Sequence, residues 1–410
     1  MRNLYARGLV VTFLLVTSAG AQEITEKELV RRFLAESPHV RELAAEVAAL
    51  RAETRGWSLW PNPSAGYVRE GAGFAEFFSY EQTLPVSGRL GQLERASSEL
   101  VGAAQFQADF RRWRLISEIR SAFYALVAAQ ERETAVRTNL HRLDGILKIL
   151  RTRETEGEGS TYDRLRTERE RSEIETEIAA IGVAAAEARS RLAAYLPRGS
   201  LPESFRAKGS MASSEPIPTL EALLTKALEA RGDYRAERQQ IAGFEYRRQA
   251  AERLRIPEPS VAAGVKRADV GPRLENGGFV SISVPLPLFN RGKTEVARFQ
   301  AEIDRAQARR QSLEQSIGAE IEAARKTLDL QRTVLSDYQR RVEEQGYQLE
   351  QIARTAYQEG EIGILQLLDA YRVNLQSRLR SLEFAFAAKR AEIDLERVVG
   401  APVLNQEVLP

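Results

Sequence analysis

The chain has 410 residues, a formal net charge of +2 and no cysteine. The lack of cysteine excludes disulfide bonds and thiolate chemistry. Acids and bases alternate along the chain, so the concentrated basic surface of a nucleic-acid binder is not expected. Ala, Glu, Lys, Leu and Arg make up roughly half of the residues, which is typical of long or coiled helices with solvated faces.

Residues 1–21 have the order of a secretory signal peptide. A basic start precedes the short apolar run 8–16, and Ala19-Gly20-Ala21 supplies a cleavage site, so the mature chain is expected to begin near Gln22. No run of about 18 apolar residues follows. A part that crosses a membrane would therefore consist of strands in a closed barrel.

The first half of the mature chain, residues 22–197, predicts a helix, a strand pair, a very long helix, a turn and a helix. The helices are expected at about 25–57, 90–156 and 161–196, and the strands at about 64–70 and 76–85. Pro61 and Pro63 end the first helix, because proline lacks an N–H and forces its predecessor toward extended geometry. Gly71-Ala72-Gly73 is expected to turn between the strands.

Residues 198–218 are rich in Gly, Ser and Pro and are predicted to be a linker. The second half, 219–400, then repeats the plan and is followed by the tail 401–410. Its helices are expected at about 219–254, 292–359 and 364–399, and its strands at about 260–268 and 277–286, with a turn at Asn276-Gly277-Gly278.

Four ordered pairs of segments, among them 194–197 with 397–400, support a duplication with a period of about 200 residues, far too long for a solenoid. The other paired segments are 60–64 with 256–260, 83–89 with 285–292, and 151–158 with 354–361. Each long helix has about 68 residues and would be roughly 100 Å long, while the two shorter helices of each half would match it when stacked end to end. A protomer is thus expected to be four parallel columns with strands at one end and tight turns at the other.

The strands alternate in polarity as membrane-barrel strands do. Val280, Ile282, Val284 and Leu286 alternate with Phe279, Ser281 and Ser283, and Phe78, Tyr80 and Leu84 lie opposite Ser79, Glu81 and Thr83 in the first half. Four strands cannot close a barrel, whereas three copies supply twelve strands around a lumen. The predicted fold is therefore mainly α with a membrane β-barrel part: duplicated helix–β-hairpin–long helix–helix units form a coiled-coil tunnel, and three protomers share a 12-stranded barrel.

Two segments carry a resemblance to a known family. The chain resembles the TolC-type outer-membrane factor family over essentially the whole mature length, notably in the stretch 357–369. The stretch 284–292, Val-Pro-Leu-Pro-Leu-Phe-Asn-Arg-Gly, is most similar to the CzcC-like branch, which serves heavy-metal and cation efflux. The resemblance implies a homotrimer in outer-membrane lipid with its tunnel in the periplasm. It also implies a periplasmic adaptor (a membrane fusion protein) and an inner-membrane pump, often of the RND class.

The resemblance also implies a gate at the helix tips. Asp369 matches one ring of the aperture, where carboxylates of three copies would favour cations, and Gln366 takes the place of the expected outer ring. Asp163 and Tyr357 match two positions of a latch between the hairpins, while Ile362 replaces its arginine. By itself, Asp369 would be interpreted as a solvated helix carboxylate.

The turns at the tips are the adaptor-docking sites that the resemblance implies. They comprise Gly157, Glu158, Gly159, Ser160, Gly360, Glu361, Ile362 and Gly363. Glycine also permits the tight backbone geometry needed between antiparallel helices, so ordinary turn chemistry explains part of this pattern.

Nothing in the sequence predicts catalysis, a cofactor or a metal site, since His39 and His141 lie about 100 residues apart with no cysteine to assist them. Trp57 and Trp60 fit either membrane-interface anchors or core residues. Two alternatives to an efflux duct stay open: a duct of a type I protein secretion system, and a soluble periplasmic coiled-coil adaptor.

Overall fold

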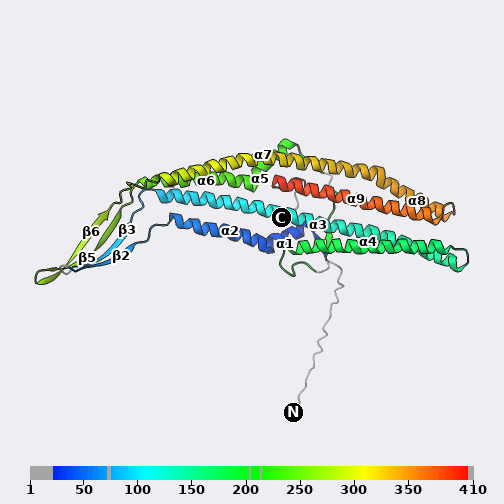
Figure 1. The fold of residues 1–410 in the computed structure, drawn as a ribbon, viewed down its shortest axis with the longest axis horizontal. Helices are drawn as coiled ribbons and strands as arrows, with labels where there is room; N and C mark the ends of the chain where they lie inside the picture. Colours follow the sequence, from blue (N-terminus) through cyan, green and yellow to red (C-terminus); the bar gives the residue numbers. More distant parts are fainter. Residues whose placement is uncertain (1–21, 72–74, 203–204, 213–214, 405–410) are drawn as a thin grey trace, which may run out of the picture.

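The computed structural model describes residues 22–71, 75–202, 205–212 and 215–404. The predicted signal peptide 1–21 lies outside the described residues, as do the centre of the predicted turn at 71–73 and most of the tail 401–410. The molecule is a long bundle of helical columns with a sheet at one end and two helical turns at the other (Figure 1).

The elements of the first half follow the predicted order. They are β1 (Glu23–Thr25), α1 (Glu26–Glu36), α2 (Pro38–Arg55), β2 (Ser64–Glu70), β3 (Ala75–Thr83), α3 (Arg89–Thr155) and α4 (Thr161–Ala193). Strand β4 (Arg206–Lys208) lies inside the predicted linker and pairs in parallel with β1. This short pair was not predicted, because three residues are too few to show a period.

The second half repeats the order, which confirms the predicted duplication. Its elements are α5 (Leu220–Ala230), α6 (Gly232–Glu252), β5 (Ser260–Val270), β6 (Arg273–Ser283), α7 (Lys293–Tyr338), α8 (Glu344–Gln358) and α9 (Ile364–Val399). A single π turn, Gln339–Glu343, joins α7 to α8, whereas α3 runs without interruption for 67 residues.

Three expectations about element boundaries were wrong. The first helix of each half is broken, at Ser37 before Pro38 and at Arg231 before Gly232. Ser37 accepts from the His39 N–H and so caps α2, with proline in the first turn where its missing N–H is tolerated. The turn expected at 276–278 lies within β6, because the chain reverses at Gly271, whose φ of +73° suits glycine.

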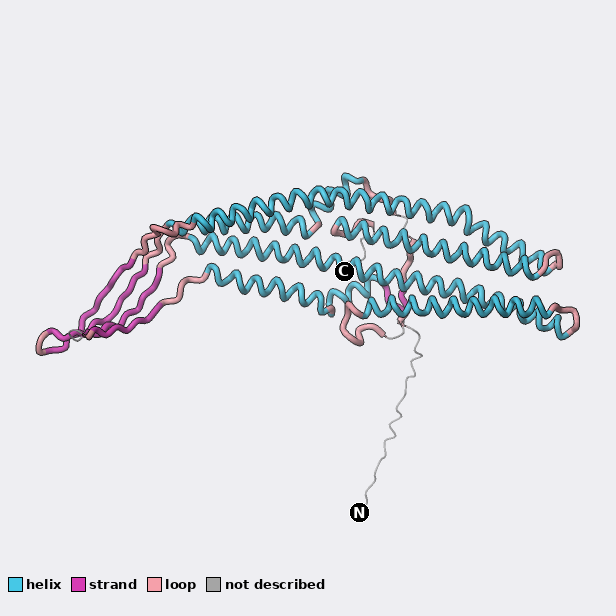
Figure 2. The backbone as a smooth tube through the Cα atoms, in the orientation of Figure 1, coloured by secondary structure: helices cyan, strands magenta, loops and turns pink. Residues whose placement is uncertain are grey.

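The four long strands form one antiparallel sheet in the order β2-β3-β5-β6 (Figure 2). Strands β3 and β5 pair from Ala75 opposite Ala268 to Thr83 opposite Ser260, and this ladder joins the two halves of the chain. Strands β2 and β6 are the edges of the sheet and are each paired on one side within the described residues.

The core runs along α3, which packs against α1, α4 and α9 through a large apolar cluster. Beside it lies Arg120, which is fully buried and pairs with Glu26 at 2.5 Å and with Glu396 at 2.6 Å. The Tyr124 hydroxyl donates to Glu26 at 2.6 Å, and the N–H groups of Val403 and Leu404 donate to Glu396. This buried network fixes both ends of the described chain at mid-height of the columns.

Candidate functional site

The sheet has one apolar face, which its register defines. Residues opposite one another on neighbouring strands point to the same face. One face therefore collects Tyr67, Phe78, Tyr80, Val261, Val265, Val280 and Ile282. Val280 is 74% exposed and Ile282 is 69% exposed, so this surface has no cover within the protomer. The opposite face carries Ser64, Ser79, Glu81, Ser260, Ser281 and Ser283, together with Val68, Phe77 and Phe279.

The two tryptophans before β2 differ in environment. Trp60 is 62% exposed where the chain enters the sheet, as an interface anchor would be. Trp57 is half-buried, and the Arg247 guanidinium stacks on its ring at 4.3 Å. The anchor interpretation therefore fits Trp60, and the packing interpretation fits Trp57.

The tip between α3 and α4 is held by charged side chains. Glu154 accepts hydrogen bonds from Thr161 at 2.8 Å and from Arg164 at 2.5 Å, and Glu168 pairs with Arg164 and Arg151. These contacts hold the pKa of the Glu154 carboxyl below its ordinary value, chiefly through the hydrogen bond from Thr161. Gly157 has a φ of +82° and turns the chain, as its predicted role requires.

The tip between α8 and α9 is held in a different way. Gly360 turns the chain with a φ of +79°, and the Gly363 N–H donates to Gln366 Oε1 at 3.1 Å. Gln366, a predicted aperture residue, thus caps the start of α9. Ile364, Leu367 and Leu368 pack into the core beneath this turn, and no ion pair joins the ends of α8 and α9 within the described residues.

The remaining predicted gate residues lie near these tips without direct contact. Asp369 is exposed on α9, one turn beyond Gln366. Tyr357 is half-buried and packs against the main apolar cluster, while Asp163 is half-buried at the start of α4. Asp163 and Tyr357 share no hydrogen bond within one chain over the residues that the structure describes, so the latch stays a prediction.

Two polar contacts that the sequence did not reveal join the hairpins. Arg372 on α9 donates to Glu170 on α4, and Arg142 on α3 pairs with Glu350 on α8 at 2.6 Å. Glu170 raises the pKa of the Arg372 guanidinium through this hydrogen bond. Burial raises the pKa of the Glu350 carboxyl and outweighs the opposing effect of Arg142. In the sequence these residues look like ordinary charges on helix surfaces.

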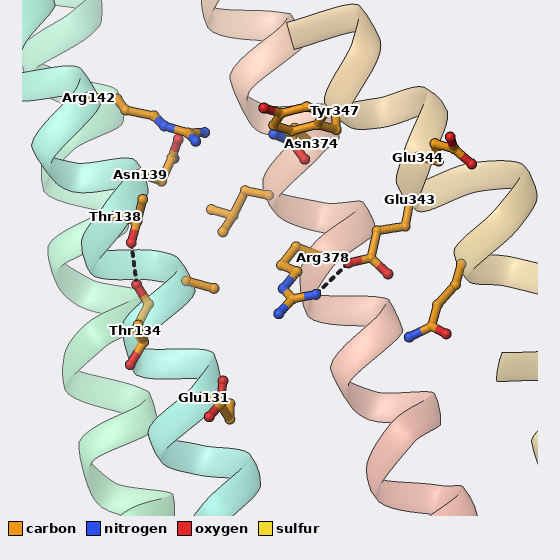
Figure 3. A pocket seen from close by; sticks show the side chains of 13 residues that line it. Glu131, Thr134, Thr138, Asn139, Arg142, Glu343, Glu344, Tyr347, Asn374 and Arg378 are labelled. Carbon is orange, nitrogen blue, oxygen red and sulfur yellow. Dashed lines mark hydrogen bonds and ion pairs between the residues drawn. The ribbon is translucent and has the colours of Figure 1, made fainter. Parts of the chain in front are cut away.

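A cavity of about 530 Å³ lies between the hairpins on the sheet side of these contacts (Figure 3). Its walls come from α3, from α9 and from the π turn with the start of α8. Arg378 on α9 pairs with Glu343 of the π turn at 2.6 Å across one side. The π turn is therefore tied to α9 where it borders the cavity.

Neither a metal centre nor a membrane-spanning helix occurs in the described part of the chain. No group of three or more His, Cys, Asp or Glu side chains there could hold a metal ion. No helix there is long and apolar enough to cross a membrane.

The fold is shared with solved outer-membrane channels. The chain superposes on the channel OprN with a TM-score of 0.70 and 19% identity, covering 93% of this chain and 90% of that one. It superposes on MtrE of Neisseria gonorrhoeae in its open state with a TM-score of 0.72 and 16% identity over 100% of both chains. The match to CusC has a TM-score of 0.70 at 17% identity and covers 97% of this chain and 99% of that chain.

The chain has the TolC-type outer-membrane channel fold. The predicted fold class, a mainly α chain of long helical columns with strands at one end, is thereby confirmed.

Comparison with known sequences agrees with the predicted similarity of this chain to the CzcC-like branch. The chain is 26% identical to the cobalt-zinc-cadmium resistance protein CzcC of Cupriavidus metallidurans over 322 residues, which are 77% of this chain and 73% of that protein. It is 24% identical to the nickel-cobalt-cadmium resistance protein NccC of Alcaligenes xylosoxydans xylosoxydans over 291 residues, which are 68% of this chain and 65% of that protein. No family model matches the chain. The predicted resemblance to this branch of the TolC-type channels is confirmed.

Proposed function

We propose that this protein is the outer-membrane exit channel of a tripartite efflux system and conducts small solutes passively. The observation that carries the proposal is the four-stranded sheet. It has one exposed apolar face, an opposite face that carries most of its serines, and two edge strands, and it stands at the end of a long helical bundle. An open sheet edge is not tolerated in lipid, so the edges must pair with other copies.

Three copies fit this sheet best. Two copies would supply eight strands, whose interior side chains fill, while three supply twelve and leave a lumen. The polar face with Ser79, Glu81 and Ser281 would then line the lumen, and Val280 and Ile282 would face lipid. The helical columns would continue the lumen into the periplasm, toward an adaptor and an inner-membrane pump of the RND class.

The substrate class proposed here is divalent metal cations. CzcC and NccC are resistance proteins for cobalt, zinc, cadmium and nickel, and this similarity supports the choice. Asp369 is exposed near the tip of α9, where three symmetry-related carboxylates would favour cations. In this proposal cations pass the channel without being held by a multidentate site.

The gate in this proposal lies between the hairpins. Arg372 and Glu170 link them within one chain, and Asp163 and Tyr357 would add a link between neighbouring chains. The turns at 157–160 and 360–363 would meet the adaptor. Release of the links on docking would let the α8–α9 hairpin move away from the axis.

The test combines assembly and transport. The chain would be extracted from the outer-membrane fraction, and its native mass and shape would be measured in detergent. We expect a trimer roughly 100 Å or more in length, as 67-residue helices require. A strain that lacks the gene should become more sensitive to zinc, cobalt or cadmium. A monomer in the soluble periplasmic fraction would overturn the proposal of a channel. A deletion strain that no longer secretes a protein but keeps its metal resistance would favour a type I secretion duct.

A further inference from the structure

A row of exposed apolar side chains continues past the end of β6. Val280 and Ile282 belong to the apolar face of the sheet, and Val284, Leu286 and Leu288 follow at the same two-residue spacing, all exposed. At about 3.3 Å per residue, Val280 and Leu288 are at most about 26 Å apart. Outer-membrane barrels carry an apolar band about 25 Å tall. A band of that height measured from Val280 would therefore end at Leu288, on the side of the helical bundle.

Basic side chains without acid partners gather at that edge. Within the described residues, none of the following takes part in an ion pair: Arg89, Arg253, Arg255, Arg291 and Lys293. Arg253 donates to the Ser87 carbonyl at 2.7 Å, and Arg291 donates to the Pro287 carbonyl at 3.3 Å, so both retain free N–H groups.

Two of these arginines share a pocket with apolar side chains. A pocket of about 210 Å³ is lined by Arg89 and Arg253 together with Leu254, Ile256 and Leu286. Glu258 also lines it and accepts a hydrogen bond from the Ser87 hydroxyl. One small space thus offers two guanidinium groups beside the aliphatic surface that borders the membrane band.

Helix dipoles add positive potential at the same level. Helices α3 and α7 start at Arg89 and Lys293 after the glycines Gly88 and Gly292, which provide no side-chain cap. Helix α3 has no acidic residue in its first turn, whereas α7 has Glu295 there, and the Ser87 hydroxyl accepts from the Arg89 N–H at 3.2 Å. A cation at a helix N-terminus is unfavourable unless an anion lies nearby, because the dipole already places partial positive charge there.

We propose that the pocket between Arg89 and Arg253 binds the phosphate of an anionic glycerophospholipid in the periplasmic leaflet. The acyl chains would lie along Leu286 and the apolar face of the sheet, and Trp60 and Leu288 would mark the headgroup level. This proposal rests on the proposed insertion in the outer membrane. It adds the class of lipid that the protein recognises and the residues that recognise it.

Native mass spectrometry of the assembled full-length channel tests the proposal. After the channel is washed free of lipid in neutral detergent, dioleoylphosphatidylglycerol or dioleoylphosphatidylcholine would be titrated in. We expect at least about tenfold tighter retention of phosphatidylglycerol, since each basic residue near an anionic headgroup adds to binding. Arg89→Gln should weaken this preference, and Arg89→Gln with Arg253→Gln should abolish it. The control Arg169→Gln with Arg191→Gln, on exposed α4 positions, should behave as wild type.

Other results would overturn the lipid site or assign the pocket to another anion. Equal retention of both lipids, or an unchanged preference in the Arg89→Gln variant, would overturn the proposal. The Arg89 side chain makes no hydrogen bond or ion pair in the described part of the protein, so its loss should not impair folding. Displacement of phosphatidylglycerol by millimolar inorganic phosphate would assign the pocket to free phosphate. A trimer that retains no lipid would refute this inference alone, whereas a chain that stays monomeric would refute the channel.

Discussion

Arg372 on α9 donates to both carboxylate oxygens of Glu170 on α4, at 2.7 and 3.3 Å, and so links the two helical hairpins near their tips. The contact joins residues 202 positions apart in the sequence. Its partners belong to different repeats, which makes it a contact that must break if the hairpins separate.

Arg372→Ala should raise the resting conductance of the reconstituted channel. An exposed ion pair contributes about 0.2–1 kcal/mol, so loss of three pairs should raise the open fraction by about threefold to a hundredfold. Planar-bilayer recording measures this directly. Arg380→Ala is the matched control, because Arg380 pairs with Glu383 on its own helix. A closed resting channel in Arg372→Ala would show that the pair does not restrain the gate.

Asp369→Asn should lower cation selectivity if Asp369 lines the aperture. Removal of three carboxylates from a narrow ring weakens the local field that attracts cations, so the potassium-to-chloride permeability ratio should fall by about twofold or more. Reversal potentials in a salt gradient give this ratio. Asp329→Asn, at an exposed position of α7 far from the tips, should leave it unchanged. The same ratio in wild type and Asp369→Asn would remove Asp369 from the pore.

A charge introduced on the apolar face of β6 should destabilise the inserted protein more than one introduced on the opposite face. Val280→Lys places an ammonium on the apolar face and should destabilise the membrane-inserted state, by less than the roughly 2–4 kcal/mol that a lysine costs at the bilayer midplane. Ser281→Lys, one residue on, points to the polar face and should be tolerated. Urea titration of the protein folded into lipid vesicles compares the two. Equal destabilisation would show that the apolar face does not meet lipid.

The buried pair of Arg120 and Glu396 should make the helical part sensitive to acid. Burial opposes ionisation of Glu396, but Arg120 and the N–H groups of Val403 and Leu404 outweigh it and hold the pKa of this carboxyl below its ordinary value. The stabilisation is therefore fully present above the ordinary carboxyl pKa of roughly 4.3 and is lost as the pH falls through the lowered value. Unfolding followed by circular dichroism between pH 7 and pH 2 should show this loss.

Arg120→Met should unfold more easily at neutral pH, by about 3–5 kcal/mol, because Glu26 and Glu396 would lose their buried partner. The variant should also lose less stability than wild type between pH 7 and pH 2. Arg111→Met, which breaks an exposed pair with Glu46, is the control and should cost less than about 1 kcal/mol. Equal stability of Arg120→Met and wild type would show that the network does not stabilise the fold.

Local signals in the sequence were enough to predict most of the fold. Prolines, glycines, and the helical and two-residue periods of apolar side chains identified the long helices, the four strands and the duplication. The reversal between β5 and β6 was misplaced because Asn276-Gly277-Gly278 is a strong turn signal, yet pairing of Val261 with Ile282 and Ala263 with Val280 keeps these glycines inside the strand. The breaks at Ser37 and Arg231 were missed although proline and glycine follow them.

The contacts between the hairpins could not be predicted in the same way. Arg142 and Glu350 are 208 residues apart, and nothing in their local sequence distinguishes them from solvated helix charges. Their pairing depends on which helix faces meet after the columns pack. The interaction of Gln366 with the start of α9 does have a local signal, since Gln366 lies three residues after Gly363, the spacing of a capping box.

The π turn at Gln339–Glu343 makes the two long columns of each chain mechanically unequal. A π turn holds one residue more than the helix around it needs, so the backbone there can change its winding by exchanging one hydrogen-bond pattern for another. Helix α3 has no such turn and must transmit torsion as a continuous rod. In a threefold assembly, the three columns formed by α7 and α8 would therefore absorb a twist applied at the tips. The three α3 helices would carry it toward the membrane.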